Sequence, residues 1–277
     1  MNIRIIPRLD IKGENLVKGI NLEGLRILGK PEEFVKEYSK FSDEIIFYDT
    51  VASLYGRNNL VNIVEQTAKN TNIPLTVEGG IRSLNDIELL LKSGADKVAI
   101  NSIAVKDKKF ITEAVKYFGS TTIVGTITYK IWPNNNFINN KFTTVGTAQS
   151  IYSNNSKSSF QVYIENAREQ TGIHAYDWAL EFIDLGIGEL HLLSIDADGK
   201  SNGPETFLIE QISKKCSLPI IYGGGLTQLS HCVDIINSHP KVSALSFASA
   251  LHYKKLTINE IKNYLLQNKF DTLVHNN

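Results

Sequence analysis

Two segments of the chain repeat one another, and one of them carries a residue that proton-transfer chemistry could use. Residues 4–12 (RIIPRLDIK) place Asp10 near the end of a strand-like run, and residues 122–130 (TIVGTITYK) place Thr128 at the matching point. An aspartate can accept or release a proton near neutral pH, whereas a threonine hydroxyl cannot do so as a carboxylic acid can. The repeat therefore predicts an acid–base residue at position 10 and none at the equivalent position 128.

Two glycine runs form a second repeated feature, EGGI at 78–81 and GGGL at 223–226. Each follows a β-branched strand and leads into a helix, so backbone N–H groups can approach an anion without a Cβ in the way. The next strands end in Asn-Ser and Ala-Ser, at loops that commonly bind phosphate in (β/α)8 barrels. The candidate phosphate-binding residues are Gly80, Asn101, Ser102, Gly224, Gly225 and Ser249.

Eight strand-like runs alternate with eight helical patterns, which indicates repeated βα units on a parallel sheet. Strands are predicted at 3–9, 44–48, 75–78, 97–101, 121–127, 189–194, 219–222 and 243–247. Helices are predicted near 31–41, 59–67, 84–92, 107–117, 175–184, 205–215, 228–238 and 257–266. Eight such units favour a closed (β/α)8 TIM barrel over an open sheet, and the repeated segments indicate two half-barrels.

We expect residues 1–277 to form this barrel as a single domain, because barrels of this kind routinely have such lengths. Residues 131–159 interrupt the pattern, since they are rich in Asn, Ser and Thr and lack apolar periodicity. This insertion lies in the loop after the fifth strand, so it would hang over the C-terminal face. A functional lid and a solvated insertion without a role are both open.

The composition excludes several classes of function. Lys+Arg and Asp+Glu each number 29, so no net field would attract nucleic acid or an anionic membrane. Cys216 and Cys232 are too few for a disulfide scaffold or a Cys-rich metal site, and no apolar run is long enough to span a membrane. We expect a cytoplasmic protein with no nucleic-acid or membrane partner, no metal and no cofactor.

Eight runs along the chain carry a resemblance to a known family: IIPRLDIK, LVKGINLEGLR, FYDTVAS, IPLTVEGGIRSLND, GADKVAINS, TGIHAYDWALEF, LLSIDADGK and FASALH. Together they resemble the cyclase subunit of imidazole glycerol phosphate synthase. The related phosphoribosyl-formimino isomerase shares the repeat, but KGINLEGLR and DADG fit the cyclase better. The resemblance implies a lyase of the glutamine-amidotransferase type. It would use ammonia from a glutaminase on a bisphosphorylated, nucleotide-derived substrate and give imidazole glycerol phosphate and aminoimidazole carboxamide ribotide.

The resemblance also assigns roles to single residues. The family's two catalytic aspartates fall on Asp10 and Thr128, so the second acid is missing, and residues 123–164 contain no Asp or Glu to replace it. Asp49 and Asp198 also fit helix caps or turns, and that alternative is open. Substrate or phosphate binding is implied for Lys18, Asp49, Gly80, Asn101, Ser102, Asp198, Gly199, Gly224, Gly225 and Ser249.

Charged residues near four strand starts match the family's gate at its ammonia entrance: Arg4, Glu44, Lys97 and Glu189. Charges at the base of a barrel core are costly unless they pair with one another. Any one of them alone also fits an ordinary exposed charge. The full set predicts a retained ammonia passage and a glutaminase subunit, in a heterodimer, docked at the N-terminal face near Asp96.

Three function classes are compatible with these residues. The first is an authentic synthase subunit, which the extent of the resemblance favours. The second is a diverged paralogue with lost or altered cyclase activity that channels ammonia to a surface-glycan sugar, which Thr128 favours. The third is a non-catalytic phosphate-binding barrel.

Overall fold

The chain folds into a closed ring of eight parallel strands. The computed structural model describes residues 2–52, 60–133 and 158–273. The ring closes because β12 pairs with β1 and β10 pairs with β7, both in parallel. The predicted (β/α)8 TIM barrel is therefore confirmed. The ring strands are β1 (Arg4–Lys12), β4 (Ile45–Asp49), β5 (Leu75–Glu78), β6 (Lys97–Ile100), β7 (Ile123–Pro133), β10 (Glu189–Ser194), β11 (Ile220–Gly223) and β12 (Val242–Phe247).

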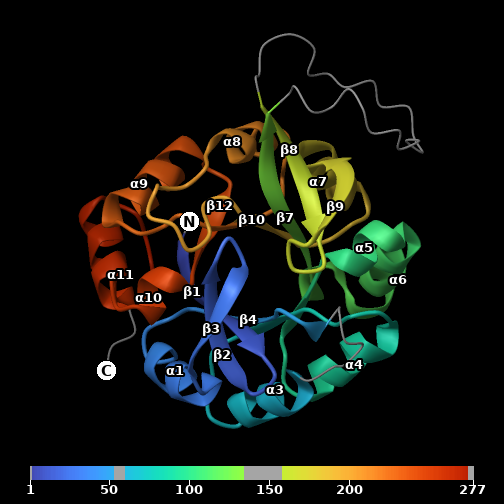
Figure 1. The fold of residues 1–277 in the computed structure, drawn as a ribbon, viewed down its shortest axis with the longest axis horizontal. Coiled ribbons are helices and arrows are strands. Elements are labelled where there is room, and N and C mark those ends of the chain that lie inside the picture. Colours follow the sequence, from blue (N-terminus) through green and yellow to red (C-terminus); the bar gives the residue numbers. More distant parts are fainter. Residues whose placement is uncertain (1, 53–59, 134–157, 274–277) are drawn as a thin grey trace.

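Helices cover the outside of the ring (Figure 1). Capping boxes start two of them, Ser83 with Asp86 before α4 and Thr257 with Glu260 before α11. Pro31 begins α1, at the position that proline favours. Within the described residues, no helix has both the length and the apolar character that a membrane span requires. The helices are α1 (Pro31–Tyr38), α3 (Leu60–Ala68), α4 (Leu84–Lys92), α5 (Ser102–Lys106), α6 (Lys108–Phe118), α7 (Ala175–Asp184), α8 (Phe207–Ser213), α9 (Leu229–Ser238), α10 (Ser249–His252) and α11 (Ile258–Gln267).

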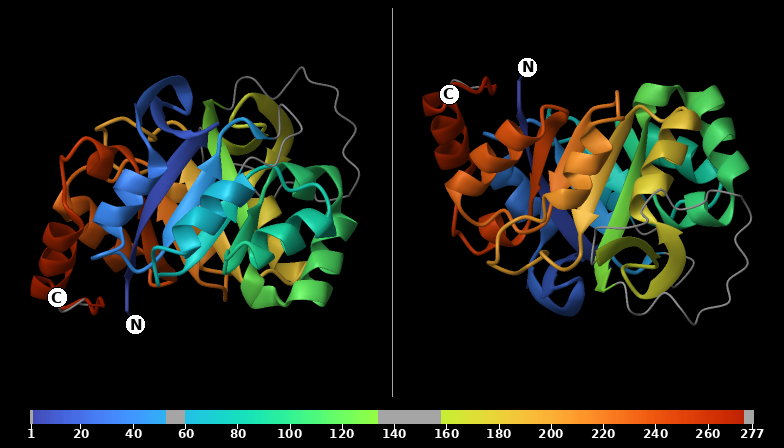
Figure 2. Two further views of the ribbon diagram at one scale, coloured as in Figure 1. Left: turned by 90° about the horizontal axis from the view of Figure 1, so that it is seen from below. Right: turned by 90° about the horizontal axis from the view of Figure 1, so that it is seen from above.

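Two antiparallel additions rise from the carboxyl end of the ring, away from the N-terminus (Figure 2). The first is the hairpin of β2 (Asn15–Ile20) and β3 (Glu23–Gly29), which pairs with β1. The second joins β8 (Ser158–Ile164) and β9 (Glu169–His174) to β7. The sequence predicted none of these four strands.

The segment predicted as an insertion at 131–159 begins and ends in strand. Ile131 and Trp132 continue β7, and they pair with Phe160 and Ser159 of β8 in antiparallel register. Antiparallel strand residues therefore stand at both ends of the predicted segment. Residues 134–157, which hold most of its Asn and Ser, lie outside the described residues.

The two half-barrels repeat each other in backbone shape. The glycine pair after β5 has φ angles of +105° and +74°, and the pair after β11 has +106° and +74°. A Cβ on Gly79 would lie 2.7 Å from the carbonyl oxygen of Asp49, and one on Gly224 would lie 2.8 Å from that of Ser194. Both loops therefore need glycine for the same two reasons, the backbone angle and the close approach of a neighbouring strand end.

Apolar side chains fill part of the barrel interior and most of the layer between ring and helices. Ile6, Ile46, Ile221 and Ala244 form a buried cluster contributed by four ring strands. A larger cluster links the outer faces of the strands to the helices. Because ring strands are buried on both faces, they appear in the sequence as nearly continuous apolar runs. The interior positions that break these runs carry charged or polar groups, and these form the candidate site.

Candidate active site

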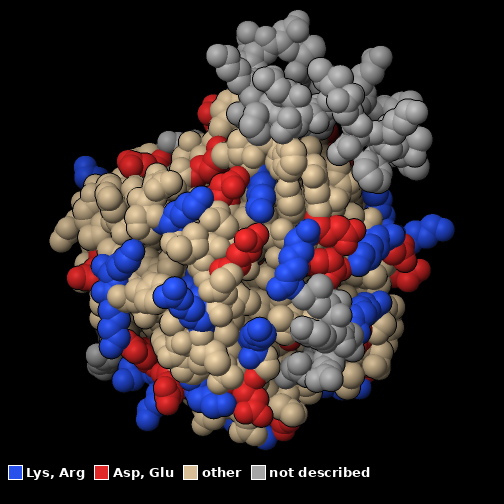
Figure 3. Space-filling model, in the orientation of Figure 1, with Lys and Arg blue, Asp and Glu red and all other residues tan. Residues whose placement is uncertain are grey.

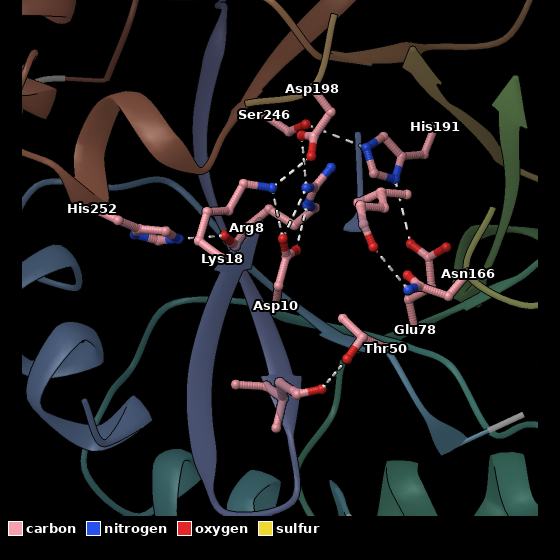
Figure 4. Close-up of polar contacts among 12 residues, drawn as sticks. Arg8, Asp10, Lys18, Thr50, Glu78, Asn166, His191, Asp198, Ser246 and His252 are labelled. Carbon is pink, nitrogen blue, oxygen red and sulfur yellow. Dashed lines mark hydrogen bonds and ion pairs between the residues drawn. The ribbon is translucent and has the colours of Figure 1, made fainter. Parts of the chain in front are cut away.

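Four charged side chains form a buried cluster at the carboxyl end of the ring, here called the mouth cluster: Arg8, Asp10, Lys18 and Asp198 (Figure 4). Arg8 donates from Nε to Asp10 Oδ1 at 2.8 Å and from Nη2 to Asp198 Oδ1 at 2.9 Å. Lys18 Nζ donates to Asp10 Oδ2 at 2.8 Å and to Asp198 Oδ2 at 2.6 Å. Each cation thus bridges both carboxylates, and the cluster is electrically neutral.

Local structure explains how these residues meet. Arg8 and Asp10 are two residues apart on β1, so both side chains face the same side of the strand. Lys18 reaches them because β2 folds back against β1, and Asp198 follows the end of β10. Gly199 lets that loop lie against the hairpin, since a Cβ there would be 2.6 Å from the carbonyl oxygen of Gly19.

Asp10 is held as a carboxylate. Burial disfavours its charge, but the charges and hydrogen bonds of Arg8 and Lys18 outweigh that effect and keep the pKa of Asp10 well below its ordinary value. In this arrangement Asp10 has no proton to give. It becomes a proton acceptor only when one of its cations moves away, for example to a negatively charged substrate.

Thr128 lies buried where the resemblance expects an acid. Its Oγ1 accepts a hydrogen bond of 3.1 Å from Asn101 Nδ2, which also donates to the carbonyl oxygen of Tyr163 at 3.3 Å. Asn101 therefore links the end of β6 to β7 and β8. The hydroxyl contributes a hydrogen bond at this position and leaves it without a titratable acid.

The candidate phosphate-binding residues fall into two pockets at the same end of the barrel. The first is a cavity of about 240 Å³ whose lining includes Asp49, Gly80, Asn101 and Ser102. The second is smaller, with a volume of about 10 Å³, about enough for one water molecule. Its lining includes Asp198, Gly199, Gly224, Gly225 and Ser249.

Asp49 and Asp198, which also fit helix caps or turns in the sequence, make different contacts in the structure. Asp49 Oδ1 accepts hydrogen bonds from the backbone N–H groups of Val51 and Ala52 at 2.9 and 2.8 Å, which is a turn-forming arrangement. Its Oδ2 is buried without a hydrogen-bond partner among the described residues, and burial raises the pKa of this carboxyl. Asp198 instead pairs with Arg8 and Lys18. The side chain of Asp49 therefore stabilises its own turn, whereas Asp198 lies in the turn after β10 and its side chain pairs with the two cations.

At the other end of the barrel the four predicted gate residues form a ring of ion pairs, here called the charged gate: Arg4, Glu44, Lys97 and Glu189. Lys97 Nζ contacts Glu44 at 3.1 Å and Glu189 at 3.0 Å. Arg4 contacts the same two carboxylates, with 2.7 Å to Glu44. The side chains of Arg4 and Lys97 are 23% and 22% exposed, so solvent reaches the ring from the N-terminal end.

Mixed charges cover the face that carries the hairpin. Lys and Arg alternate there with Asp and Glu, without a large area of one sign (Figure 3). This agrees with the balanced composition of 29 basic and 29 acidic residues. Attraction of a phosphorylated ligand must therefore come from local groups at the mouth. Among the described residues, no three His, Cys, Asp or Glu side chains are placed to hold a metal ion.

Three interior residues were not predicted as site residues from the sequence: Arg8, Glu78 and His191. Arg8 lies within the RIIPRLDIK segment, two residues before Asp10. Glu78 and His191 are buried inside the ring, with a Glu78 oxygen 3.5 Å from His191 Nδ1 (Figure 4). A signal was present, because a charged or ionisable residue within a β-branched strand that is buried on both faces is unusual.

His252 packs behind the mouth cluster and makes stability depend on pH. Its Nε2 is 3.0 Å from the carbonyl oxygen of Arg8 and its Nδ1 is 3.0 Å from the hydroxyl of Tyr38. Burial lowers the pKa of His252 to about 4. In the unfolded chain the pKa is about 6.5, so between these values the unfolded state binds the extra proton.

We therefore expect the free energy of unfolding to fall as pH decreases from about 6.5 to 4, with His252 contributing on the order of 3 kcal/mol. Above this window the contribution is fully present. Urea denaturation across the window should show a steeper loss in the natural chain than in His252→Gln. Equal slopes in the two proteins would contradict the assignment.

Comparison with known proteins places the chain among relatives of similar length. The family model described as "Histidine biosynthesis protein" matches residues 4–257. The chain is 44% identical to imidazole glycerol phosphate synthase subunit HisF of Legionella pneumophila, over 82% of this chain and 97% of the relative. It is 41% identical to that of Prochlorococcus marinus, over 96% and 95%, and 40% identical to that of Methanococcus maripaludis, over 96% and 96%.

Proposed function

The chain belongs to the histidine biosynthesis protein family, and on that premise we propose that it is the synthase subunit of an imidazole glycerol phosphate synthase. It would take ammonia from a glutaminase and act as a lyase and cyclase on a bisphosphorylated, nucleotide-derived substrate. One observation carries the proposal. Two pockets built by equivalent glycine loops lie at one end of a barrel whose other end is closed by a ring of paired charges.

The two pockets suit the two phosphates of such a substrate. Each has glycine N–H groups in a loop between strand and helix, which can donate to phosphate oxygens without steric obstruction. Ser102 in the first pocket and Ser249 in the second add a hydroxyl at equivalent places. Because the second pocket is much smaller than the first, we expect the loop around Gly225 to move when the substrate binds.

The mouth cluster would supply the proton acceptor. Ring closure and carbon–nitrogen bond cleavage require a group that takes a proton and a group that gives one. Asp10 becomes the acceptor when substrate oxygens draw Arg8 or Lys18 away, because its pKa then rises toward the ordinary value. Thr128 supplies no proton in return, so turnover should be slow.

The test is an assay of the purified chain with ammonium and the bisphosphorylated substrate, with the products identified by mass spectrometry. Slow formation of imidazole glycerol phosphate and aminoimidazole carboxamide ribotide supports the proposal. A second candidate is favoured by the missing acid at Thr128: a relative that passes ammonia to another acceptor, such as a surface-glycan sugar. It predicts no product here but altered activity of a co-expressed glutaminase. If neither the product nor altered glutaminase activity is observed, the remaining candidate is a non-catalytic phosphate-binding barrel.

The charged gate is proposed to admit ammonia from a glutaminase at the N-terminal face. Asp96 is exposed beside the gate and would contact the partner, while its Oδ2 accepts a hydrogen bond of 2.8 Å from the backbone N–H of Leu75. Asp96→Asn would retain an acceptor for that hydrogen bond and remove the charge. Weaker co-purification of the glutaminase with this variant would support the proposed face.

Lys97→Ala should lower glutamine-dependent product formation by about 10-fold or more. The two buried carboxylates of the charged gate lose a charge-assisted contact, so the paired arrangement at the proposed ammonia entrance is lost. Product formation from ammonium added to the medium should change much less, since that ammonia can enter from the mouth. Lys92→Ala, which removes an exposed lysine on α4, is the matched control. Equal losses with both nitrogen sources would show that Lys97 does not act at an ammonia entrance.

A further inference from the structure

A carboxylate and an imidazole face each other inside the barrel and take no part in the mouth cluster or the charged gate. Glu78 on β5 is 1% exposed and His191 on β10 is 0% exposed. These strands are not neighbours in the ring, so a separation of 3.5 Å between Glu78 Oε2 and His191 Nδ1 spans the interior. His191 Nε2 is also 3.2 Å from the hydroxyl of Ser246 on β12.

These residues occupy the level next to the charged gate. Glu78 stands two residues beyond Thr76, whose hydroxyl donates to Glu44 of the gate. His191 stands two residues beyond Glu189, another gate residue. Side chains two apart on a strand face the same way and are separated by about 6.6–6.8 Å along it. Anything that passes the gate toward the mouth therefore meets Glu78 and His191 next.

The hydrogen bonding at this level is incomplete. Neither carboxylate oxygen of Glu78 has a hydrogen-bond partner among the described residues, and the same holds for Thr126 Oγ1. Thr126 is the register partner of His191 on the adjacent strand β7. Buried polar groups are normally satisfied, and an unpaired buried carboxylate is especially unfavourable. Three acceptors in one place point to a small ligand rich in hydrogen-bond donors.

Neither neutral tautomer of His191 removes this demand. If Nε2–H donates to Ser246, the lone pair of Nδ1 faces a carboxylate oxygen, and a proton or cation is needed between them. If Nδ1 carries the proton, it faces Oε2 at 3.5 Å, and Oε1 of Glu78 still lacks a donor. In both tautomers a carboxylate oxygen and the Thr126 hydroxyl have acceptor capacity that no described residue fills.

We propose that Glu78, His191 and Thr126 form a binding site for ammonium inside the barrel. Ammonium offers four N–H donors in the volume of a water molecule, and its charge neutralises Glu78. Apolar side chains also line the interior, since Ile6, Ile46, Ile221 and Ala244 form a buried cluster there. The site rests on the proposed use of ammonia and deepens it, because it places a holding point between gate and mouth.

Ammonium from the medium can reach this site without a partner protein. Glu78 is among the residues that line the first mouth pocket, together with Gly79, Gly80 and Asn101, so this pocket adjoins the interior site from the open end of the barrel. Binding can therefore be measured on the isolated chain, with neither glutaminase nor acceptor substrate present.

The experiment is a titration of the ¹⁵N-histidine-labelled chain with ammonium chloride, followed through the ring nitrogen resonances. Of the six histidines, His191 is identified by the signal missing from a His191→Gln sample. We expect a saturable shift of the His191 resonances with ammonium and none with sodium chloride at the same ionic strength. Glu78→Gln should weaken ammonium binding by about 10- to 100-fold, the loss expected for one hydrogen bond to a charged group. Glu88→Gln, an exposed carboxylate on α4, should leave it unchanged.

The proposal is overturned if ammonium and sodium give the same response, since the interior groups would then be satisfied by water alone. It is also overturned if Glu78→Gln binds ammonium as tightly as the natural chain. Should Glu78→Gln fold poorly, Thr126→Val provides the same comparison through a neutral residue, with weaker binding expected. Product formation without ammonium binding would contradict this site and would still support the proposed function. Ammonium binding without any product would support the site and contradict the proposed function.

Discussion

Replacement of Arg8 with methionine is expected to lower the free energy of unfolding by about 3–5 kcal/mol. The reason lies in the balance of the mouth cluster. Arg8 bridges Asp10 and Asp198, and without it two buried carboxylates share the single cation of Lys18. Methionine has a similar length and no polar group, so the loss reports the unpaired charge more than a cavity. Urea denaturation followed by circular dichroism measures it.

A double variant separates charge imbalance from lost packing. Arg8→Met combined with Asp198→Asn removes one cation and one anion, and leaves Lys18 paired with Asp10 at 2.8 Å. We expect it to recover most of the stability that the single variant loses, giving a large interaction energy in the double-mutant cycle. A single variant that loses less than about 1 kcal/mol would show that the cluster is solvated and loosely paired, as surface ion pairs are.

Thr128→Asp is expected to raise turnover with ammonium and the bisphosphorylated substrate by about 10²–10⁴-fold, the usual contribution of a positioned general acid or base. The site can accept this change. Thr128 Oγ1 already accepts a hydrogen bond from Asn101, and an aspartate oxygen can accept the same bond. Burial at this position should raise the pKa of the new carboxyl, which favours its action as an acid.

Thr128→Asn is the matched control, because it has the shape of aspartate and no titratable proton. It should leave the slow turnover of the natural chain unchanged. Two results would count against the account of the missing acid. One is turnover of the natural chain at ordinary enzyme rates, about 1–10³ per second. The other is equal activity of the Asp and Asn variants.

The positions of the eight ring strands could be predicted from the sequence, because these strands are apolar on both faces. The hairpin of β2 and β3 could not. Its turn places Asn21 and Leu22 at φ angles of +56° and +62°, although leucine rarely adopts them and no glycine marks the position. Contacts with the loop after β10 hold it, since Asn21 donates to the carbonyl oxygens of Asp198 and Ile195 at 2.9 and 2.7 Å. Such tertiary contacts leave no local pattern.

Candidate site residues were predictable where a motif repeated, and less so where the fold creates a contact. The glycine loops appear twice in the sequence, and the structure brings them to one end of the barrel. The pairing of Glu78 with His191 depends on barrel closure and strand register, which bring β5 and β10 face to face. The ionised state of Asp10 likewise depends on Lys18 from the unpredicted hairpin.

The central claim is that ammonia enters through the charged gate and is used at the mouth. The measurement that tests it most directly supplies the chain and a co-expressed glutaminase with amide-¹⁵N glutamine, the bisphosphorylated substrate and an excess of unlabelled ammonium. Mass spectrometry then gives the isotope in imidazole glycerol phosphate. The account predicts product enriched in ¹⁵N far above the medium, with enrichment lost in Lys97→Ala. Product that carries only the isotope ratio of the medium, or no product at all, would contradict it.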